Sequence, residues 1–289
     1  MRYSCIHTHT TFCDGRDDIE TFCRTAYERG FVSLGFSSHA PIRQKTGLVS
    51  GWHISDDRFQ EYLDAVLSAR RRWEGKLPVY IGLEVDYIRG MIGPADREFQ
   101  SLGLDYLIGS VHYVIPPDGS LPFTVDDPPD EFSQKVREHF GGDGEGVMEA
   151  YWDAMDDMIR AGGFDLLAHP DLIKKNNRGE GFFSRKSETY LSRLKKVADS
   201  AAQSGIVVEV NTGGLLRGWT DELYPELRFL RLFKEKNIPL TITADAHRAE
   251  HLGGYYAEAR KALLESGYTQ TVLFEGRSHG RPVWTGDPL

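Results

Sequence analysis

The sequence predicts one domain, residues 1–289, folded as a (β/α) barrel with about seven strands. Short apolar segments alternate about seven times with longer amphipathic ones, which is typical of parallel βαβ units. The length of 289 residues suits a barrel, because this fold takes about 250 residues. Histidines and carboxylates follow six of the seven apolar segments, which indicates that the strand ends converge on one rim.

The expected strands are short runs rich in β-branched and aromatic residues. In chain order they cover residues 3–6, 31–37, 78–83, 106–111, 164–168, 206–210 and 239–243. A further candidate covers 271–274. An open doubly wound sheet fits the same alternation, but its outer strands diverge, so their ends could not share one site. The placement of the polar residues therefore favours the closed barrel.

The helices expected between these strands have apolar residues at near-helical spacing and recognisable ends. They cover residues 18–29, 56–73, 94–102, 147–161, 187–204, 221–237 and 255–266. For the first of them, Asp17 or Asp18 is the expected cap and Gly30 the expected terminator. Residues 115–146 are rich in Pro, Gly and Asp with little periodicity, so they are expected to form a lid or a partly mobile segment.

Composition and charge narrow the class of protein. The formal net charge of −9 disfavours a nucleic-acid partner. It leaves a small phosphorylated substrate possible, because bound divalent ions reverse the charge locally. No apolar run reaches the roughly 18 residues of a membrane span, and the N-terminus has no signal-peptide pattern. A cytoplasmic protein without a membrane partner is therefore expected.

The three cysteines, Cys5, Cys13 and Cys23, are odd in number and lack the spacing of a disulfide framework. Cys5 and Cys13 lie close in sequence to the N-terminal histidines, and a thiolate can bind zinc. We nevertheless expect all three to be reduced packing residues, because a free cysteine is usually a small buried hydrophobe.

The polar residues after the strands have the chemistry of metal ligands, because imidazole and carboxylate together form the ligand set of Zn, Mn and Fe sites. His7 and His9 stand two apart, so both can face one side of a strand, and Asp245 and His247 repeat this spacing. The full set is His7, His9, Asp14, His39, Glu84, His112, His169, Asp245 and His247. So large a set predicts a cluster of metals and metal-assisted hydrolysis of a phosphate ester.

Two carboxylates of this set need a separate argument. Glu84 lies among apolar strand residues, where an unpaired charge would be costly, and a carboxylate can bridge two ions. Asp86 is expected to lie behind a ligand or to face solvent. Asp14 could be a turn residue, but the loop after His9 must pass near the site, so ligation is expected. The remaining histidines are expected to be ordinary hydrogen-bonded residues: His53, His139, His251 and His279.

The order of these motifs resembles the polymerase and histidinol phosphatase (PHP) family over essentially the whole chain. The motifs that carry the resemblance are residues 7–9, 39, 84, 112, 169–170 and 245–247. Segments 82–88, 108–112 and 168–174 are similar to the histidinol-phosphate phosphatase branch of that family. The resemblance implies an α/β fold, a single-domain distorted (β/α)7 TIM-like barrel, with a trinuclear centre of divalent metal ions such as Zn, Mn or Fe.

By that resemblance, the nine ligands divide among three ions. The first ion would be held by His7, His9, Glu84 and Asp245. The second would be held by His112, His169 and a bridging Glu84. The third would be held by Asp14, His39 and His247, although some family members carry His where this chain has Asp14. The residues expected to take part in catalysis are Glu84, His169, Asp245 and His247.

The resemblance implies a phosphoric monoester hydrolase that converts L-histidinol phosphate to L-histidinol and phosphate in histidine biosynthesis. A metal-bridging hydroxide would attack phosphorus. Two alternatives stay open: a nucleotide or other small-molecule phosphatase of the same fold, and a non-catalytic barrel that keeps metals for stability. A structural zinc usually has four closed ligands, often cysteines, so dispersed N/O ligands favour catalysis. The sequence leaves the choice of metal and the oligomeric state open.

Charged residues in the loops after the strands are candidates for substrate contacts. Arg89, Lys174 and Lys175 are the preferred phosphate anchors. Asp171 is expected to orient an imidazole or to meet a cationic substrate group, since carboxylates behind metal ligands commonly do the former. Aromatic and acidic residues of the 115–146 segment are expected to close over a substrate amine.

Overall fold

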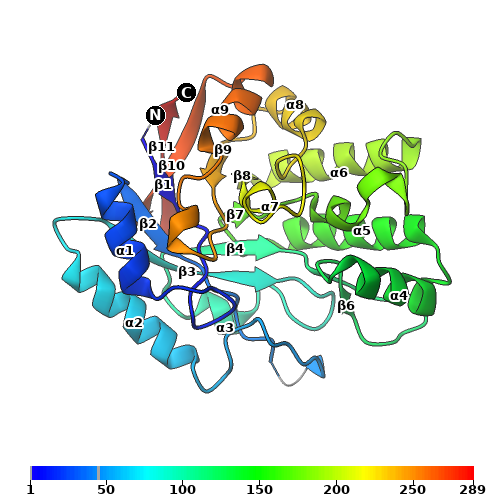
Figure 1. Ribbon diagram of the computed structural model, residues 1–289, viewed down its shortest axis with the longest axis horizontal. Helices are drawn as coiled ribbons and strands as arrows, with labels where there is room; N and C mark the ends of the chain where they lie inside the picture. The colour runs from blue at the N-terminus through cyan, green and yellow to red at the C-terminus, as the bar shows by residue number, and fades with distance from the viewer. Residues whose placement is uncertain (1, 44–45) are drawn as a thin grey trace.

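The structure is a computed structural model that describes residues 2–43 and 46–289. Among these residues, seven parallel strands form one sheet in the order β1-β2-β3-β4-β7-β8-β9 (Figure 1). The strands are β1 (Ser4–Cys5), β2 (Ser33–Phe36), β3 (Val79–Asp86), β4 (Tyr106–Ser110), β7 (Leu166–Leu167), β8 (Val207–Asn211) and β9 (Leu240–Thr243). Because the spatial order never reverses, the sheet winds in one direction, as a barrel does and a doubly wound sheet does not.

Backbone hydrogen bonds at the ends of β1 and β9 bring the first and last strands together. The Ala246 N–H donates to the His7 carbonyl at 3.1 Å, and the His9 N–H donates to the Ala246 carbonyl at 2.9 Å. Thr8 and Ala246 are parallel bridge partners. The sheet is thus nearly closed, and the prediction of a seven-stranded (β/α) barrel is confirmed.

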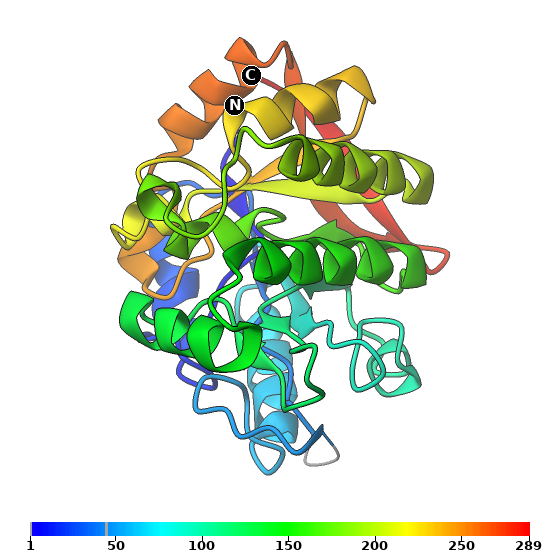
Figure 2. The same ribbon diagram turned by 90° about the vertical axis from the view of Figure 1, so that its right-hand side faces the viewer.

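Helices surround this sheet, as Figures 1 and 2 show. The α-helices are α1 (Ile19–Glu28), α2 (Phe59–Arg72), α3 (Arg97–Gln100), α4 (Pro129–Phe140), α5 (Gly144–Ala161), α6 (Glu188–Ser204), α7 (Gly213–Leu216), α8 (Leu227–Glu235) and α9 (Tyr256–Glu265). Asp18, one of the two expected caps, caps α1 by accepting a hydrogen bond from the Thr21 N–H at 2.7 Å. In the described part of the chain, no helix is both long and apolar enough to cross a membrane.

One helix expectation was too long at its N-terminus. The segment expected to be helical over 221–237 forms a helix only from Leu227 to Glu235. Pro225 stands inside the expected range, and proline is tolerated only in the first turn of a helix. The preceding segment therefore pairs elsewhere: Tyr224 exchanges backbone hydrogen bonds with Asn211 at the end of β8.

The inside of the barrel is filled by a separate apolar cluster near the amino-terminal ends of the strands. Its buried members are Ile6, Tyr106, Ile108, Leu166, Ala168, Val207 and Phe274. The Tyr106 hydroxyl donates to the Ile6 carbonyl at 2.6 Å. Gly82 makes room for this ring, because a Cβ at that position would lie 2.6 Å from ring carbons of Tyr106. Apolar filling at this end leaves only the opposite end of the barrel for polar residues.

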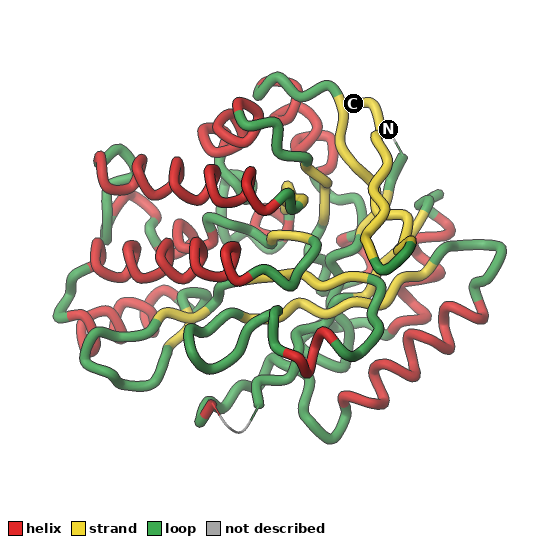
Figure 3. Tube along the Cα trace, turned by 180° about the vertical axis from the view of Figure 1, so that it is seen from behind, coloured by secondary structure: helices red, strands yellow, loops and turns green. Residues whose placement is uncertain are grey.

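A C-terminal hairpin closes the amino-terminal end of the barrel, and the sequence predicted only a fragment of it. Strands β10 (Gln270–Ser278) and β11 (Arg281–Pro288) pair antiparallel, whereas only 271–274 was expected as a strand. Figure 3 shows this hairpin as two long strands beside both chain ends. Phe274 enters the inner cluster, and Arg277 binds the Asp165 carboxylate at 3.0 Å.

The 115–146 segment is more regular than the sequence suggested. It contains β6 (Phe123–Thr124), which pairs with β5 (Tyr113–Val114), and the whole of α4. Phe132 and Val136 lie one helical turn apart and are buried, and Gly141 ends the helix at a φ of 61°. The many Pro, Gly and Asp residues lie at the ends of these short elements. Because α4 buries only one turn, its apolar spacing was too short to be recognised in the sequence.

Candidate metal centre

The structure brings all nine predicted ligands together at the carboxyl-terminal end of the barrel. Strands β3 and β4 point toward the right in Figure 1, so Figure 2 looks onto this end. Period-2 alternation explains the convergence, because Gly82 and Glu84 share the face of β3 that lines the interior. Most of the ligand side chains are buried, and Asp14 is the most open at 32% exposure.

Glu84 is the centre of the cluster, and its two oxygens face different histidines. Oε1 lies 3.0 Å from His169 Nε2 and 3.7 Å from His112 Nε2. Oε2 lies 3.1 Å from His7 Nε2 and 3.3 Å from His9 Nε2. The Glu84 side chain is 1% exposed. A carboxylate placed between two groups of imidazoles has the geometry of a bridge between two cations.

Asp245 faces His7 and His9 from the end of the neighbouring strand, β9. Its Oδ1 lies 3.2 Å from His9 Nε2 and 3.6 Å from His7 Nε2. Its Oδ2 accepts a hydrogen bond from Arg217 Nη2 at 2.8 Å. Although burial acts in the opposite direction, Arg217 and His7 hold the pKa of Asp245 well below its usual range. The carboxylate therefore stays ionised and able to bind a cation.

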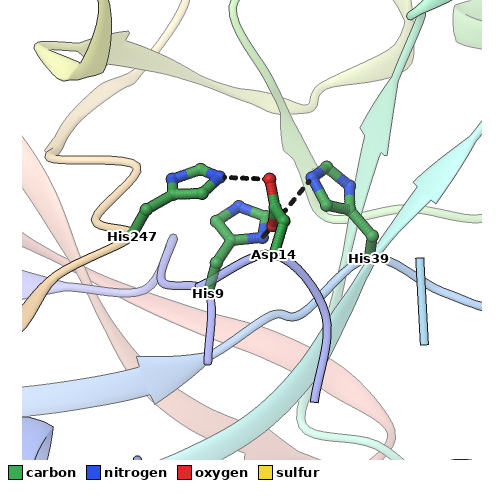
Figure 4. A group of neighbouring side chains, drawn as sticks. All are labelled: His9, Asp14, His39 and His247. Carbon is green, nitrogen blue, oxygen red and sulfur yellow. Dashed lines mark hydrogen bonds and ion pairs between the residues drawn. The ribbon is translucent and has the colours of Figure 1, made fainter. Parts of the chain in front are cut away.

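Four ligand side chains form a quartet beside the group of His7, His9 and Asp245, with His9 shared between the two, and the quartet is drawn in Figure 4. The ligand atoms of His9, Asp14, His39 and His247 all lie within 4.8 Å of one another. Asp14 stands between the rings, with Oδ2 3.0 Å from His247 Nε2 and Oδ1 3.9 Å from His39 Nε2. The other His39 nitrogen, Nδ1, lies 3.1 Å from Glu84 Oε2 and so links the two halves of the cluster.

Unpartnered polar atoms test whether these residues suit metal ions. Within the described residues, His9 Nε2, Asp14 Oδ1 and His39 Nδ1 are buried and have no hydrogen-bond partner. Each such atom costs roughly 1–3 kcal/mol when nothing satisfies it. Imidazole nitrogens and carboxylate oxygens are ligand atoms for divalent metals, which would remove that cost. The residues present therefore fit divalent cations well.

Two further carboxylates lie behind the ligands. Asp86 Oδ1 is 2.8 Å from His112 Nδ1, and Asp86 Oδ2 is 2.7 Å from His53 Nε2. The first of the two sequence interpretations of Asp86 is therefore right: it lies behind a ligand and is 3% exposed. Glu209 binds His7 Nδ1 at 2.8 Å, and the sequence analysis missed it. The available signal was a carboxylate inside an otherwise apolar strand, two residues before Asn211.

Arg217 was also missed, because it stands six residues beyond the last residue of β8. It lies just after α7, and its Nη1 donates to the Asp245 carbonyl at 2.8 Å and lies 2.9 Å from His247 Nδ1. Its guanidinium also covers the Trp219 ring at 4.3 Å. No local pattern in the sequence indicates these contacts. They form because the segment after β8 packs against Asp245 and His247, which follow β9.

The structure does not bring Arg89, Lys174 or Asp171 to the cluster, contrary to the sequence expectation. Arg89 is 58% exposed and pairs with Asp157 at the surface. Lys174 Nζ donates to Asp171 Oδ2 at 2.8 Å. Asp171 Oδ2 also accepts from the Glu226 N–H at 2.7 Å, so within the described residues it binds a lysine and a backbone amide rather than an imidazole. Residues in the same loop as a ligand can point away from it.

Lys175 lies closer to the site but is already engaged. Its Nζ lies 2.7 Å from Asp126 Oδ1 and 3.9 Å from the centre of the Trp219 ring. Asp126 and Trp219 both border the cavity above the cluster. Lys175 thus contacts two residues of the cavity wall, Asp126 and Trp219, and does not itself line the cavity.

The cavity above the cluster has a volume of about 260 Å³. Seven of the nine ligands line it, together with Trp52, Thr124, Asp126, Asp127, Pro128, Leu172, Arg217 and Trp219. Residues 124–128 belong to the segment expected to act as a lid, and they form one wall. Asn176 Nδ2 holds this wall by donating to the Val125 carbonyl at 2.9 Å.

The cysteines behave as expected, since all three are free. Cys13 Sγ lies 3.6 Å from His9 Nδ1. Burial, with the neighbouring Asp14 charge, raises the pKa of the Cys13 thiol to about 12. The thiol is therefore protonated at neutral pH and packs behind the histidine.

The fold and the site together define the class of metal-dependent barrel hydrolases, because a nearly closed seven-stranded barrel brings imidazoles and carboxylates together around the buried Glu84. More particularly, the chain belongs to the PHP domain family, whose model matches residues 6–213. The family resemblance inferred from the motifs is thereby confirmed.

Curated relatives cover nearly the whole chain. It is 28% identical over 272 residues to the probable histidinol-phosphatase of Deinococcus radiodurans, covering 94% of this chain and 96% of that protein. It is 27% identical over 271 residues to the histidinol-phosphatase of Bacillus subtilis, covering 90% of this chain and 97% of that protein. A probable histidinol-phosphatase of Schizosaccharomyces pombe is 28% identical, covering 93% of this chain and 88% of that protein.

Solved structures share the fold. The putative histidinol phosphatase of Listeria monocytogenes has a TM-score of 0.78 at 22% identity, covering 88% of this chain and 99% of that one. The histidinol phosphate phosphatase of Lactococcus lactis, complexed with Zn, L-histidinol and phosphate, has a TM-score of 0.67 at 18% identity. That match covers 98% of this chain and 99% of the other.

Proposed function

We propose that this protein is a metal-dependent histidinol-phosphatase that converts L-histidinol phosphate to L-histidinol and phosphate. The observation that carries the proposal is the convergence of nine metal-type ligands on Glu84 in a chain whose full-length relatives bear this name. The open, N/O-rich ligand set favours catalysis over a structural role, because structural zinc sites are closed by four ligands.

The ligand groups support three divalent ions, which is the arrangement the family resemblance implies. One group surrounds Glu84 Oε2 and Asp245 Oδ1 and contains His7 and His9. A second surrounds Glu84 Oε1 and contains His112 and His169. The third is the quartet of His9, Asp14, His39 and His247. Zinc is the first metal to test, since the Lactococcus relative was crystallised with it, and Mn and Fe suit the same ligands.

When bound, such ions supply a nucleophile from water at neutral pH and neutralise the charge that develops on the phosphate oxygens. The chain's own residues do the positioning. Glu84, His169, Asp245 and His247 would hold the ions where they border the cavity, and Arg217, which pairs with Asp245, adds a guanidinium group to the cavity wall. We therefore propose Arg217 as a phosphate anchor in place of Arg89 and Lys174, which do not line the cavity.

Other residues of the cavity lining suit the rest of the substrate. L-histidinol phosphate carries an ammonium group and an imidazole beside its phosphate, and both are cationic or polar. The carboxylates of Asp126 and Asp127 border the cavity, as do the rings of Trp52 and Trp219. A cavity of about 260 Å³ admits a small phosphomonoester and excludes a folded nucleic acid.

The test is phosphate release by the purified enzyme loaded separately with Zn, Mn or Fe. We expect higher kcat/KM for L-histidinol phosphate than for adenosine and thymidine monophosphates. The same preparation stripped with a chelator serves as the control. Release from the nucleotides with none from L-histidinol phosphate would select the alternative, a nucleotide phosphatase of the same fold.

A further inference from the structure

Glu209 is a fully buried carboxylate in the middle of β8, and it does not line the cavity. Its side chain is 0% exposed. Nevertheless, every one of its contacts leads toward the cluster. Within the described residues its donors are His7 Nδ1 at 2.8 Å, Thr243 Oγ1 at 2.7 Å, the His169 N–H at 2.8 Å and Asn211 Nδ2 at 2.7 Å.

The contact with His7 decides which nitrogen of that ring can bind a cation. An ionised carboxylate can only accept hydrogen bonds, so the proton of His7 lies on Nδ1, facing Glu209 Oε2. The other nitrogen, Nε2, faces Glu84 Oε2 at 3.1 Å and Asp245 Oδ1 at 3.6 Å. With a divalent ion bound among these groups, the neutral ring keeps its proton on Nδ1, and the Nε2 lone pair can bind the ion.

The second oxygen acts on the other side of the cluster. Glu209 Oε1 accepts from the backbone N–H of His169. The side chain of His169 in turn places Nε2 3.0 Å from Glu84 Oε1. One carboxylate thus stands behind a ligand on each side of the Glu84 bridge.

We infer that Glu209 is a positioning residue that keeps His7 in its Nδ1–H form and ties the His7 side of the metal centre to the His169 side. The inference deepens the proposed function, since it concerns the same metal centre. It makes no use of the identity of the substrate. Carboxylates that bind the free nitrogen of a metal-bound histidine set its orientation and raise metal affinity by about 10–100-fold.

The variant Glu209→Gln tests this tautomer argument with almost no change of shape. If the amide NH₂ replaced Oε1, it would meet two donors, the His169 N–H and Asn211 Nδ2. The amide oxygen therefore stays at Oε1, and the NH₂ replaces Oε2. There it donates to His7 Nδ1 and forces the ring proton onto Nε2, while the Thr243 hydroxyl turns to accept. His7 then offers no lone pair to the cluster.

The measurement is zinc binding in the absence of substrate, by competition with a chromophoric chelator, together with zinc per chain by elemental analysis. We expect Glu209→Gln to bind zinc about 10–100-fold more weakly at one site. The matched control is Glu226→Gln, a buried carboxylate that pairs with Arg185 away from the cluster, and it should bind zinc as the wild type does. Equal affinity and stoichiometry in Glu209→Gln and wild type would overturn the inference.

A second measurement needs no stable variant at position 209. In zinc-loaded wild-type protein with ¹⁵N-labelled histidine, the His7 signals should show a protonated Nδ1 and an unprotonated Nε2. The His7→Gln spectrum identifies which signals belong to this ring. An unprotonated His7 Nδ1 would reject the tautomer argument. Neither measurement uses a phosphate ester, so a failed histidinol phosphatase assay would refute the proposed substrate and leave this inference standing.

Discussion

Replacing Glu84 with Gln is the most direct perturbation of the proposed centre. The carboxylate faces two sets of imidazoles: His169 Nε2 is 3.0 Å from Oε1, and His7 Nε2 is 3.1 Å from Oε2. The amide of Gln has one oxygen and one NH₂ group, so in either orientation one set meets a donor instead of an anion. Glu84→Gln therefore removes the bridge while keeping the volume of the side chain.

The size of the effect follows from what the bridge supports. Bound metals supply several kcal/mol of transition-state stabilisation, and we take about 4 kcal/mol for the stabilisation that is lost with the bridged ions. Because each 1.36 kcal/mol changes a rate about tenfold, kcat/KM for L-histidinol phosphate should fall about 10³-fold. Because the ions would stabilise the transition state more than the bound substrate, most of the decrease should appear in kcat.

The assay is phosphate release under saturating zinc, accompanied by elemental analysis and by circular dichroism of wild type and variant. Glu226→Gln again serves as the buried control with a carboxylate removed elsewhere. The reasoning is refuted if Glu84→Gln keeps kcat/KM within tenfold of wild type at unchanged metal content. Unfolding of Glu84→Gln alone would instead favour the alternative in which the metals only stabilise the barrel.

Three other predictions concern stability and metal removal. Phe274→Ala should lower the free energy of unfolding by about 3–5 kcal/mol, because the ring fills the inner cluster at 1% exposure; an unchanged denaturation midpoint would contradict that packing role. Chelator treatment should abolish phosphate release and lower the thermal midpoint, with both restored by zinc; full activity after verified metal removal would disprove metal dependence. In metal-free protein, burial lowers the pKa of His112, but Asp86 raises it, and the net result is a rise from 6.5 to about 9. The contribution of His112 to the free energy of unfolding is therefore complete below pH 6.5 and is lost as the pH rises through about 9. Denaturation from pH 6 to 10 checks this, and an identical profile for Asp86→Asn would contradict it.

Much of the metal centre could be predicted from the sequence because its ligands are local to strand ends. His7 and His9 stand two apart at the end of β1, and Glu84 lies at an inward position of β3, so strand periodicity alone gives their direction. The same argument located His112 and His169 after their strands. The chain alternation then specified the barrel, since only a closed sheet brings so many strand ends together.

Residues that act on the ligands from behind were harder to predict. The face of β8 that carries Glu209 is known only once the sheet is closed, because a one-residue change of register would turn the side chain outward. His53 was expected to be an ordinary hydrogen-bonded residue, and it does make such bonds, but its partner is Asp86, 33 residues away. The pairing depends on how two separate loops pack.

Loop charges gave the weakest predictions. Arg89 and Arg217 both follow strands, yet the first is 58% exposed at the surface and the second lies at the cavity wall. Proximity in sequence to a ligand limits how far a residue can be from the site, but it leaves the direction of a long side chain open.

The sequence by itself determined the order of strands and helices, the barrel, and the side chains that can bind metal, because backbone periodicity and ligand chemistry are local properties. Only the tertiary structure decided that Glu209 and Arg217 join the centre, that Arg89 and Lys174 do not, and that a C-terminal hairpin closes the far end of the barrel. The physical reason is that these contacts join segments far apart in the chain. Their geometry is set by packing across the whole barrel.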